Sequence, residues 1–470
     1  MSRWPWIDVA GQRPVRGWIG VAARVAAITL PLLTVLVAFT GWFDTITRRS
    51  GHLAFAIPLV FLFCPASRPR DGQPSRLPVA DLGLAALALL VFARPIVDRE
   101  RIMWRLVYVD PVPWLDLVFG TVAVLLVLEA TRRTLGWTLV WVALVFIAYA
   151  FAGPLMPGML EHRGVAFPML VEHLYLVPEG LFNAITGVMA TFLLIFLMFG
   201  TLLRYAGGDR VFTELTRAAT ARSVGGPAKA EIVGSALVGT VTGSTIATLM
   251  TTATVTIPLM IRSGYRPVEA AAIASAASTG GAIVPPVMGA GVFIMAEITQ
   301  IPLLTILGYS ILPAIVYYAG VYAYVHVKAH KRGMMPVAPE RDTPTLGASI
   351  RRGIHLLLPL GLLVFMLARD YSPFFAASAT VVALFLVSFL RTETRLDLGR
   401  LAAALEVTTR EALVLSATSA IAAVVLGVIT ISGLMLKVTA LTLALAQGSL
   451  LIGVAIIALL CLVLGFSLPV

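Results

Sequence analysis

The residues with the clearest capacity for chemistry lie in one stretch of the chain that carries no charge. Residues 240–256 contain eight threonines together with Ser244, and glycines at positions 239 and 243 border the densest group, Thr242–Thr245. Hydroxyl oxygens and freed backbone carbonyls are hard, neutral donors that suit a small hard cation such as Na⁺. A proton relay would instead use Asp, Glu or His, and none of these occurs between Gly234 and Ile261. The residue types therefore favour sodium binding over proton binding.

Two further candidate groups lie where a helix is expected to break. Residues 269–296 form a weakly apolar segment that is interrupted by Ser278-Thr279-Gly280-Gly281 and again by Pro285-Pro286. Proline removes a helix hydrogen bond and clashes with the preceding turn, so we expect this segment to unwind near its middle. A third turn-like sequence, Leu464–Val470, follows the apolar run at about 450–465. Interrupted apolar segments in corresponding places of two halves point to the binding site of a secondary transporter.

A simpler explanation of the threonines is also open. Small and hydroxyl-bearing residues pack helices against one another in membranes without binding anything. Thr248, Thr251 and Thr252, taken singly, fit that explanation, whereas the cluster Thr242–Thr245 at a predicted chain reversal favours a functional role.

The composition indicates which elements must position these residues. The chain has 470 residues, of which 59% are hydrophobic and 13% are charged, with a mean hydropathy of +0.93. Soluble domains carry about 25% charged residues, so the composition excludes a cytosolic enzyme, a disordered chain and a nucleic-acid binder. It indicates a polytopic protein of the lipid bilayer. The net charge of +11 agrees with lysines and arginines collected in cytoplasmic loops.

Because a spanning helix needs about 20 mostly apolar residues, the chain can be divided into predicted spans. Apolar runs occur at about 18–43, 53–65, 79–94, 114–129, 135–157, 181–206, 303–327, 353–368, 374–390 and 412–435. Residues 232–261 differ, because Lys229 precedes them and Arg262 and Arg266 follow them. We therefore expect a re-entrant hairpin that enters and leaves on the cytoplasmic side, with its tip at Gly239–Thr245.

The distribution of basic residues predicts a cytoplasmic N-terminus and a basic cytoplasmic loop at 391–410. Residues 207–222 are amphipathic and are expected to form a helix on the cytoplasmic surface. Two arginine-bearing segments, Arg48–Arg49 and Asp98–Arg105, fall on the opposite side of the predicted topology and break the rule.

Enzymatic chemistry finds little support, and we expect that the chain is not an enzyme. It has no G-x-x-x-x-G-K-[ST] loop, no H-E-x-x-H motif and only two cysteines, Cys64 and Cys461. Gly243-Ser244 could suggest an intramembrane serine protease, but no histidine lies nearby in the sequence to act as its base.

At this point several motifs resemble the tripartite ATP-independent periplasmic (TRAP) transporters, and more narrowly their fused permeases, which join the small and large membrane subunits. The resemblance is densest in Gly225-Gly-Pro-Ala-Lys229, Gly239–Thr245, Thr256-Ile-Pro-Leu-Met260, Gly264-Tyr-Arg-Pro267, Ala276-Ala-Ser-Thr-Gly-Gly281, Pro285-Pro-Val-Met-Gly289 and Phe293-Ile-Met-Ala-Glu297. It extends more loosely over about 180–470, and only by helix pattern over 1–160.

The resemblance implies an all-α, elevator-type secondary transporter with inverted repeats and re-entrant helical hairpins. Residues 1–160 would form a small-subunit-like bundle of four or five spans, and 161–470 a large-subunit-like permease region. Such a permease, in the bacterial inner membrane, imports small organic acids, either dicarboxylates or amino-acid-like anions, with a sodium gradient. A periplasmic solute-binding protein of the TAXI type would deliver the substrate. Na⁺ as coupling ion is expected, and no cofactor.

The resemblance also carries the binding roles onto particular residues. The expected ion- and substrate-binding residues are Thr242, Gly243, Ser244, Thr245, Ser278, Thr279, Gly280, Gly281, Pro285, Pro286, Gly465, Ser467 and Pro469. Ser244 and Thr279 are expected to supply hydroxyl ligands to Na⁺.

Departures from the family pattern leave an alternative open. Ala274 and Ala282 stand where polar residues are expected, and Phe466-Ser467 replaces Met-Gly. The second tip also ends without the threonines that follow it in the family. A truncated, non-transporting membrane protein or assembly remnant of such a permease is therefore the alternative hypothesis.

Overall fold

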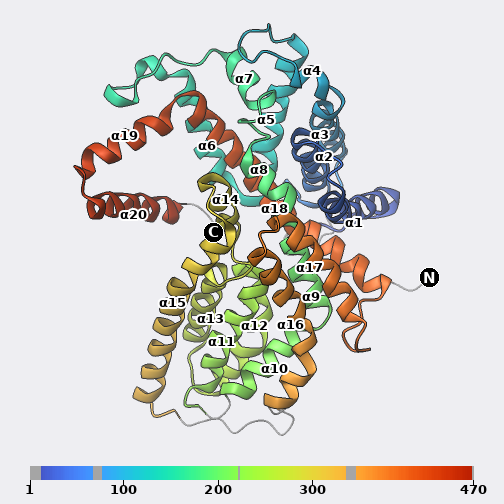
Figure 1. Ribbon diagram of the computed structural model, residues 1–470, viewed down its shortest axis with the longest axis vertical. Helices are drawn as coiled ribbons and strands as arrows, with labels where there is room; N and C mark the ends of the chain where they lie inside the picture. Colours follow the sequence, from blue (N-terminus) through green and yellow to red (C-terminus); the bar gives the residue numbers. More distant parts are fainter. Residues whose placement is uncertain (1–11, 67–76, 221–222, 335–345, 468–470) are drawn as a thin grey trace. The chain divides into compact units, whose positions relative to one another are not determined.

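The computed structural model describes residues 12–66, 77–220, 223–334 and 346–467, and these are helical with no strand among them (Figure 1). Seven of the described helical segments are long and apolar enough to cross a membrane: Gly17–Thr40, Val79–Val97, Trp114–Leu135, Ala184–Tyr205, Thr245–Arg262, Leu303–Lys331 and Leu398–Ile431. The prediction of an all-α polytopic membrane protein is confirmed. The elevator mechanism and the inverted repeats remain predictions.

The helices pack into two units. Unit 1 comprises Met1–Leu30, Gly41–Ala190 and Thr409–Val470, and unit 2 comprises Pro31–Thr40 and Thr191–Thr408. Two helices, α1 (Gly17–Thr40) and α18 (Leu398–Ile431), contribute residues to both units. The predicted division at residue 160 rests on a resemblance to separate subunits and stays a prediction.

Unit 1 is built around closely packed apolar helices. Its elements besides α1 and α18 are α2 (Thr45–Phe63), α3 (Val79–Val97), α4 (Arg99–Met103), α5 (Trp114–Leu135), α6 (Trp137–Phe151), η1 (Gly153–Leu155), η2 (Gly158–Leu160), α7 (Phe167–Tyr175), α8 (Ala184–Val188), α19 (Leu434–Ala446) and α20 (Leu450–Ser467). Leu53, Ile57 and Phe61 of α2 are fully buried, beside the small residues Ala88 and Ala123. Small side chains let helix backbones approach closely, which explains the tight packing of α2 on α3.

Two helices in the structure begin outside the apolar runs that predicted them. The predicted 53–65 run is part of α2, which begins at Thr45, where the Asp44 side chain accepts hydrogen bonds from the N–H groups of Ile46 and Thr47. The prediction of a loop over 391–410 is wrong from Leu398 onward, because α18 begins there. Arg410 is buried within α18, and its guanidinium lies 4.2 Å from the Phe63 ring centroid.

Unit 2 contains the two segments predicted to be functional. Its elements are α9 (Leu194–Tyr205), α10 (Gly208–Thr220), α11 (Gly226–Thr242), α12 (Thr245–Arg262), α13 (Pro267–Gly280), η4 (Gly281–Ile283), α14 (Ala290–Thr299), α15 (Leu303–Lys331), α16 (Leu346–Ala368) and α17 (Pro373–Ser388). A π-helical turn, η3 (Met189–Leu193), precedes α9. Helix α11 packs on α12, α13 and α15 (Figure 1). Ala228, Ile232, Met260, Ile273 and Val325 form part of the shared core.

Within the predicted amphipathic segment, residues Gly208–Thr220 form α10, and part of its apolar face packs against protein. Val211, Phe212 and Leu215 lie against α16. Gly353 of α16 comes so close that a Cβ there would lie 2.0 Å from Cγ1 of Val211. Helix α10 thus packs part of its apolar face against α16, and its contact with the membrane surface stays a prediction.

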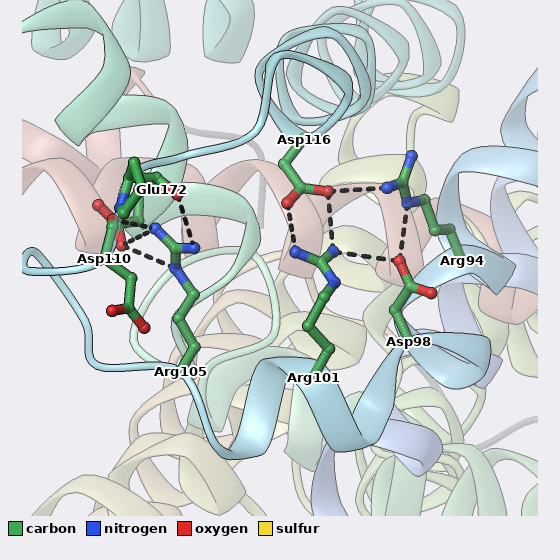
Figure 2. Close-up of polar contacts among 8 residues, drawn as sticks. Arg94, Asp98, Arg101, Arg105, Asp110, Asp116 and Glu172 are labelled. Atoms are coloured by element: carbon green, nitrogen blue, oxygen red, sulfur yellow. Dashed lines mark hydrogen bonds and ion pairs between the residues drawn. The ribbon is translucent and has the colours of Figure 1, made fainter.

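In the second rule-breaking segment, Asp98–Arg105, Arg101 and Arg105 are paired with carboxylates, whereas Arg49 of the first segment donates to the Phe182 carbonyl. Figure 2 shows Asp116 of α5 accepting from Arg94 at 3.0 Å and from Arg101 at 2.7 Å, while Asp98 pairs with the same two arginines. Burial alone would raise the pKa of Asp98, but hydrogen bonds from Arg101 and Arg94 outweigh it and hold that pKa below its ordinary value.

A second bridge continues this pattern at the end of the same segment. Arg105 lies 3.1 Å from Glu172 of α7, and both side chains are buried (Figure 2). These arginines are therefore held in ion pairs within unit 1.

We predict that Asp116→Asn destabilises unit 1 by about 1–3 kcal/mol, because two guanidinium groups lose the charge of a fully buried acceptor. Thermal unfolding of the purified chain in detergent measures the effect. Glu100→Gln removes an exposed carboxylate from neighbouring α4 and serves as the control. Equal unfolding temperatures for the two variants would show that the Asp116 bridge contributes nothing.

Candidate functional site

The predicted hairpin is present, and its reversal falls within the predicted tip. Helix α11 ends at Thr242, and Gly243 follows with φ of 57°, a left-handed conformation that glycine adopts without strain. Ser244 begins α12 as its N-cap, and its Oγ accepts from the N–H of Ala247 at 3.3 Å. The Thr242 and Thr248 hydroxyls lie 2.8 Å apart across the tip. The predicted chain reversal is confirmed, although helix α11 continues past Gly239 to Thr242.

The predicted break in the second segment is also present. Helix α13 ends at Gly280, the short helix η4 covers Gly281–Ile283, and α14 begins only at Ala290. Pro285 and Pro286 lie in the non-helical stretch between η4 and α14. The Gly289 N–H donates to the Ala282 carbonyl at 2.8 Å, which closes this stretch into a compact turn.

The structure brings the hairpin tip and the broken helix together through their backbones. The Val287 N–H donates to the Thr240 carbonyl at 3.2 Å. A Cβ on Gly239 would lie 2.4 Å from the Gly281 Cα, and one on Gly243 would lie 1.8 Å from the Met288 carbonyl oxygen. Only glycine fits at these two positions, so the close packing of the hairpin tip against the broken helix depends on Gly239 and Gly243.

Four helix ends therefore meet in one place. Helices α11 and α13 finish there, and their C-terminal ends carry partial negative charge. Helices α12 and α14 begin there, and their N-terminal ends carry partial positive charge. Such a meeting offers carbonyl oxygens to a cation and N–H groups to an anion within one small region.

The hydroxyls of the broken helix are less engaged with the tip than the sequence suggested. Ser278 is buried, and both its hydroxyl and that of Thr279 donate to the Ser275 carbonyl, at 3.0 and 2.8 Å. Gly280 lies against the rings of Tyr317 and Tyr318 in α15. Within residues 223–334, no hydrogen bond joins Thr279 to Ser244. A shared Na⁺ between these two hydroxyls stays a prediction.

The third predicted group lies in unit 1. Helix α20 continues through Ser467, so Gly465 and Ser467 belong to a helix where the sequence predicted a turn. Pro469 lies outside the described residues. Their binding role is not tested by this arrangement and stays a prediction.

Sequence reasoning missed one carboxylate of the hairpin. Glu231 of α11 is fully buried, and its Oε1 accepts from Ser235 at 2.9 Å and from Thr252 of α12 at 2.7 Å, while Thr256 donates to Oε2. Glu231 lies three residues before Gly234, where the uncharged stretch begins, and therefore fell outside the residues considered as ligands. The spacing of Glu231 and Ser235, four residues apart on one helix, was the available signal.

Lys229, which the sequence analysis read only as a basic flank, is also buried. Its Nζ lies 3.0 Å from Nδ1 of His326 in α15 and 5.1 Å from the Tyr322 ring centroid. A residue expected to mark the cytoplasmic boundary is thus part of the packing between α11 and α15.

We predict that Gly243→Ala destabilises unit 2 by at least about 1–2 kcal/mol, the cost of a left-handed alanine, with the clash against Met288 added. Thermal unfolding in detergent is the measurement. Gly291→Ala is the matched control, because a Cβ there meets nothing within 4 Å and alanine favours a helix. If Gly243→Ala unfolds no earlier than Gly291→Ala, the close approach is absent.

Comparison with known proteins identifies the family. The sequence profile of the family described as the tripartite ATP-independent periplasmic transporter, DctM component, matches residues 122–470. The C4-dicarboxylate TRAP transporter large permease protein DctM of Pseudomonas aeruginosa is 28% identical over 209 residues, which cover 43% of this chain and 47% of that protein. The match thus spans about half the length of that relative. Because the profile covers most of the chain, the chain belongs to the DctM-component family of TRAP transporters.

Proposed function

We propose that this chain is the membrane permease of a sodium-coupled secondary transporter that imports small organic acids across the bacterial inner membrane. The observation that carries the proposal is the backbone contact between the hairpin tip and the broken helix. That contact brings together the ends of α11, α12, α13 and α14. The C-terminal ends offer carbonyl oxygens to a cation, and the N-terminal ends offer N–H groups to an anion.

Sodium coupling is supported by the oxygen atoms at the tip. The hydroxyls of Thr242, Ser244 and Thr245 and the freed carbonyls at the end of α11 are neutral oxygen donors of the kind that hold hard cations. Hydroxyl clusters in membrane helices can also serve only to pack helices against one another. Sodium-dependent uptake distinguishes ion binding from packing alone.

The substrate class follows from chemistry and from the relative. The N-terminal ends of α12 and α14 favour a negatively charged group, which suits a carboxylate. The matched relative is named as a C4-dicarboxylate permease, so we propose dicarboxylates or amino-acid-like acids as substrates. A periplasmic solute-binding protein, of the TAXI type by the resemblance, would deliver them.

The same resemblance guides the remaining proposals. Residues 1–160 would act as a fused small subunit, the N-terminus would lie in the cytoplasm, and the hairpin region would move as an elevator. The cytoplasmic N-terminus is proposed from the basic residues of the predicted loops at 66–76 and 328–352.

We predict that proteoliposomes containing the chain and its binding protein take up a labelled C4-dicarboxylate only with an inward Na⁺ gradient. Ser244→Leu should abolish uptake, because it removes the tip hydroxyl and the N-cap, while membrane insertion remains intact. Ser244→Thr should retain most uptake, since threonine keeps both features.

Thr254→Leu provides the matched control on the exposed face of α12. Absence of sodium-dependent uptake by the unmodified chain would favour the non-transporting alternative. Sodium dependence that survives Ser244→Leu would mean that the tip is not the sodium site.

A further inference from the structure

The hairpin contains a buried carboxylate without a cationic partner. Glu231 is 0% exposed, and its hydrogen-bond partners are the three hydroxyls of Ser235, Thr252 and Thr256. Among the described residues, no ion pair includes Glu231. Lys229 lies two positions away on α11, a spacing that does not place side chains on one face, and its amine contacts His326.

Most titratable groups on the helices packed around α11 have partners other than Glu231, and Asp209 of α10 is a second, half-buried carboxyl, whose charge interacts with Arg204. From α15, Tyr318 is near enough to feel the Glu231 charge, but its hydroxyl donates to the Ala277 carbonyl at 2.9 Å. The remaining charged side chains with known contacts pair away from Glu231: Glu269 of α13 with Arg332 and Lys328, Glu214 of α10 with Arg210, and Arg204 of α9 with Thr201. Helix α12 presents only threonines to the carboxylate.

An isolated buried carboxylate is costly, and the usual response is to bind a proton. The hydroxyls around Glu231 can accommodate that change. Thr252 Oγ1 lies 2.7 Å from Glu231 Oε1 and 3.0 Å from the Thr248 carbonyl, and Thr256 Oγ1 likewise reaches both Oε2 and the Thr252 carbonyl. Each hydroxyl has one hydrogen and two available acceptors.

The two protonation states are therefore both satisfied without backbone movement. When Glu231 is ionised, the threonine hydrogens point to the carboxylate. When Glu231 is protonated, a threonine turns its hydrogen to the helix carbonyl and accepts the carboxylic O–H. Thr248, whose carbonyl accepts from Thr252 at 3.0 Å, also places its own hydroxyl 2.8 Å from the Thr242 hydroxyl at the tip.

We propose that Glu231 is a reversible proton-binding site inside the α11–α12 hairpin, which supplies a proton to the transport cycle alongside the cation at the tip. The role in transport rests on the proposed function, whereas proton binding itself is a property of the purified chain. The site corrects the expectation, drawn from residues 234–261 alone, that the hairpin lacks a proton-binding group.

The test is a pH titration of the full chain in lipid nanodiscs, followed by infrared difference spectroscopy of the carbonyl stretch of protonated carboxyl groups. The unmodified chain should show a buried-carboxyl band that titrates with pH. Glu231→Gln should lose the Glu231 component of this band, leaving any contribution from Asp209 of α10, whose pKa burial raises to about 6. Glu393→Gln, the same change at an exposed position of unit 2, should keep it.

Thr252→Val leaves Glu231 in place and covers the case in which Glu231→Gln does not fold. It removes one donor to the ionised carboxylate, so the midpoint of the band should move to higher pH. A titrating band of undiminished intensity in Glu231→Gln, or a band that is displaced by Na⁺ at constant pH, would overturn the proposal. A midpoint that is the same in Thr252→Val and the unmodified chain would also overturn it.

A transport arm separates this proposal from the proposed function. Glu231→Gln should flatten the pH profile of uptake while Glu393→Gln leaves the profile unchanged. If the unmodified chain shows no uptake but the Glu231 band titrates, the proton site stands and the transport function fails. If uptake occurs with the same pH profile in both variants, Glu231 has no part in transport.

Discussion

The contact on which unit 2 depends is an approach of backbone to backbone at the tip of the hairpin. Gly239 faces the Cα of Gly281, and Gly243 faces the Met288 carbonyl, at distances that leave no room for a side chain. In a membrane every backbone polar group needs a partner, and here the broken helix and the hairpin supply partners to each other through Val287 and Thr240. Backbone groups left unpaired by a helix break would be costly in lipid. In this contact they lie against protein.

Under the proposed function, that contact would let a region poor in charge interact with ions. The oppositely polarised ends of four helices meet there, so partial charges of both signs are present without a lysine or an aspartate. The hydroxyls of Thr242 and Ser244 extend the same chemistry. Glu231 lies in α11 of the same hairpin and is an ionisable side chain. Its three hydroxyl partners satisfy its hydrogen bonds in either protonation state.

Much of this organisation was predictable because it depends on local sequence. A glycine in a left-handed conformation at 243 and two consecutive prolines at 285–286 both disfavour a continuous helix, and both breaks are where they were expected. The apolar runs gave the helical fold for the same reason. The features that were missed depend on contacts between distant segments. Glu231 became notable only through Thr252 and Thr256, and the rule-breaking Arg101 only through Asp116. The start of α18 at Leu398 was hidden because its first turns carry the basic residues that usually mark a loop.

If the backbone contact creates the proposed cation site, breaking the contact should abolish sodium binding, and a contact-breaking variant tests this most directly. Gly239→Val separates the tip from Gly281 while leaving every hydroxyl in the sequence. Isothermal titration calorimetry of the purified chain should show saturable sodium binding that Gly239→Val loses and Gly291→Val retains. Undiminished sodium binding by a folded Gly239→Val chain would contradict the account.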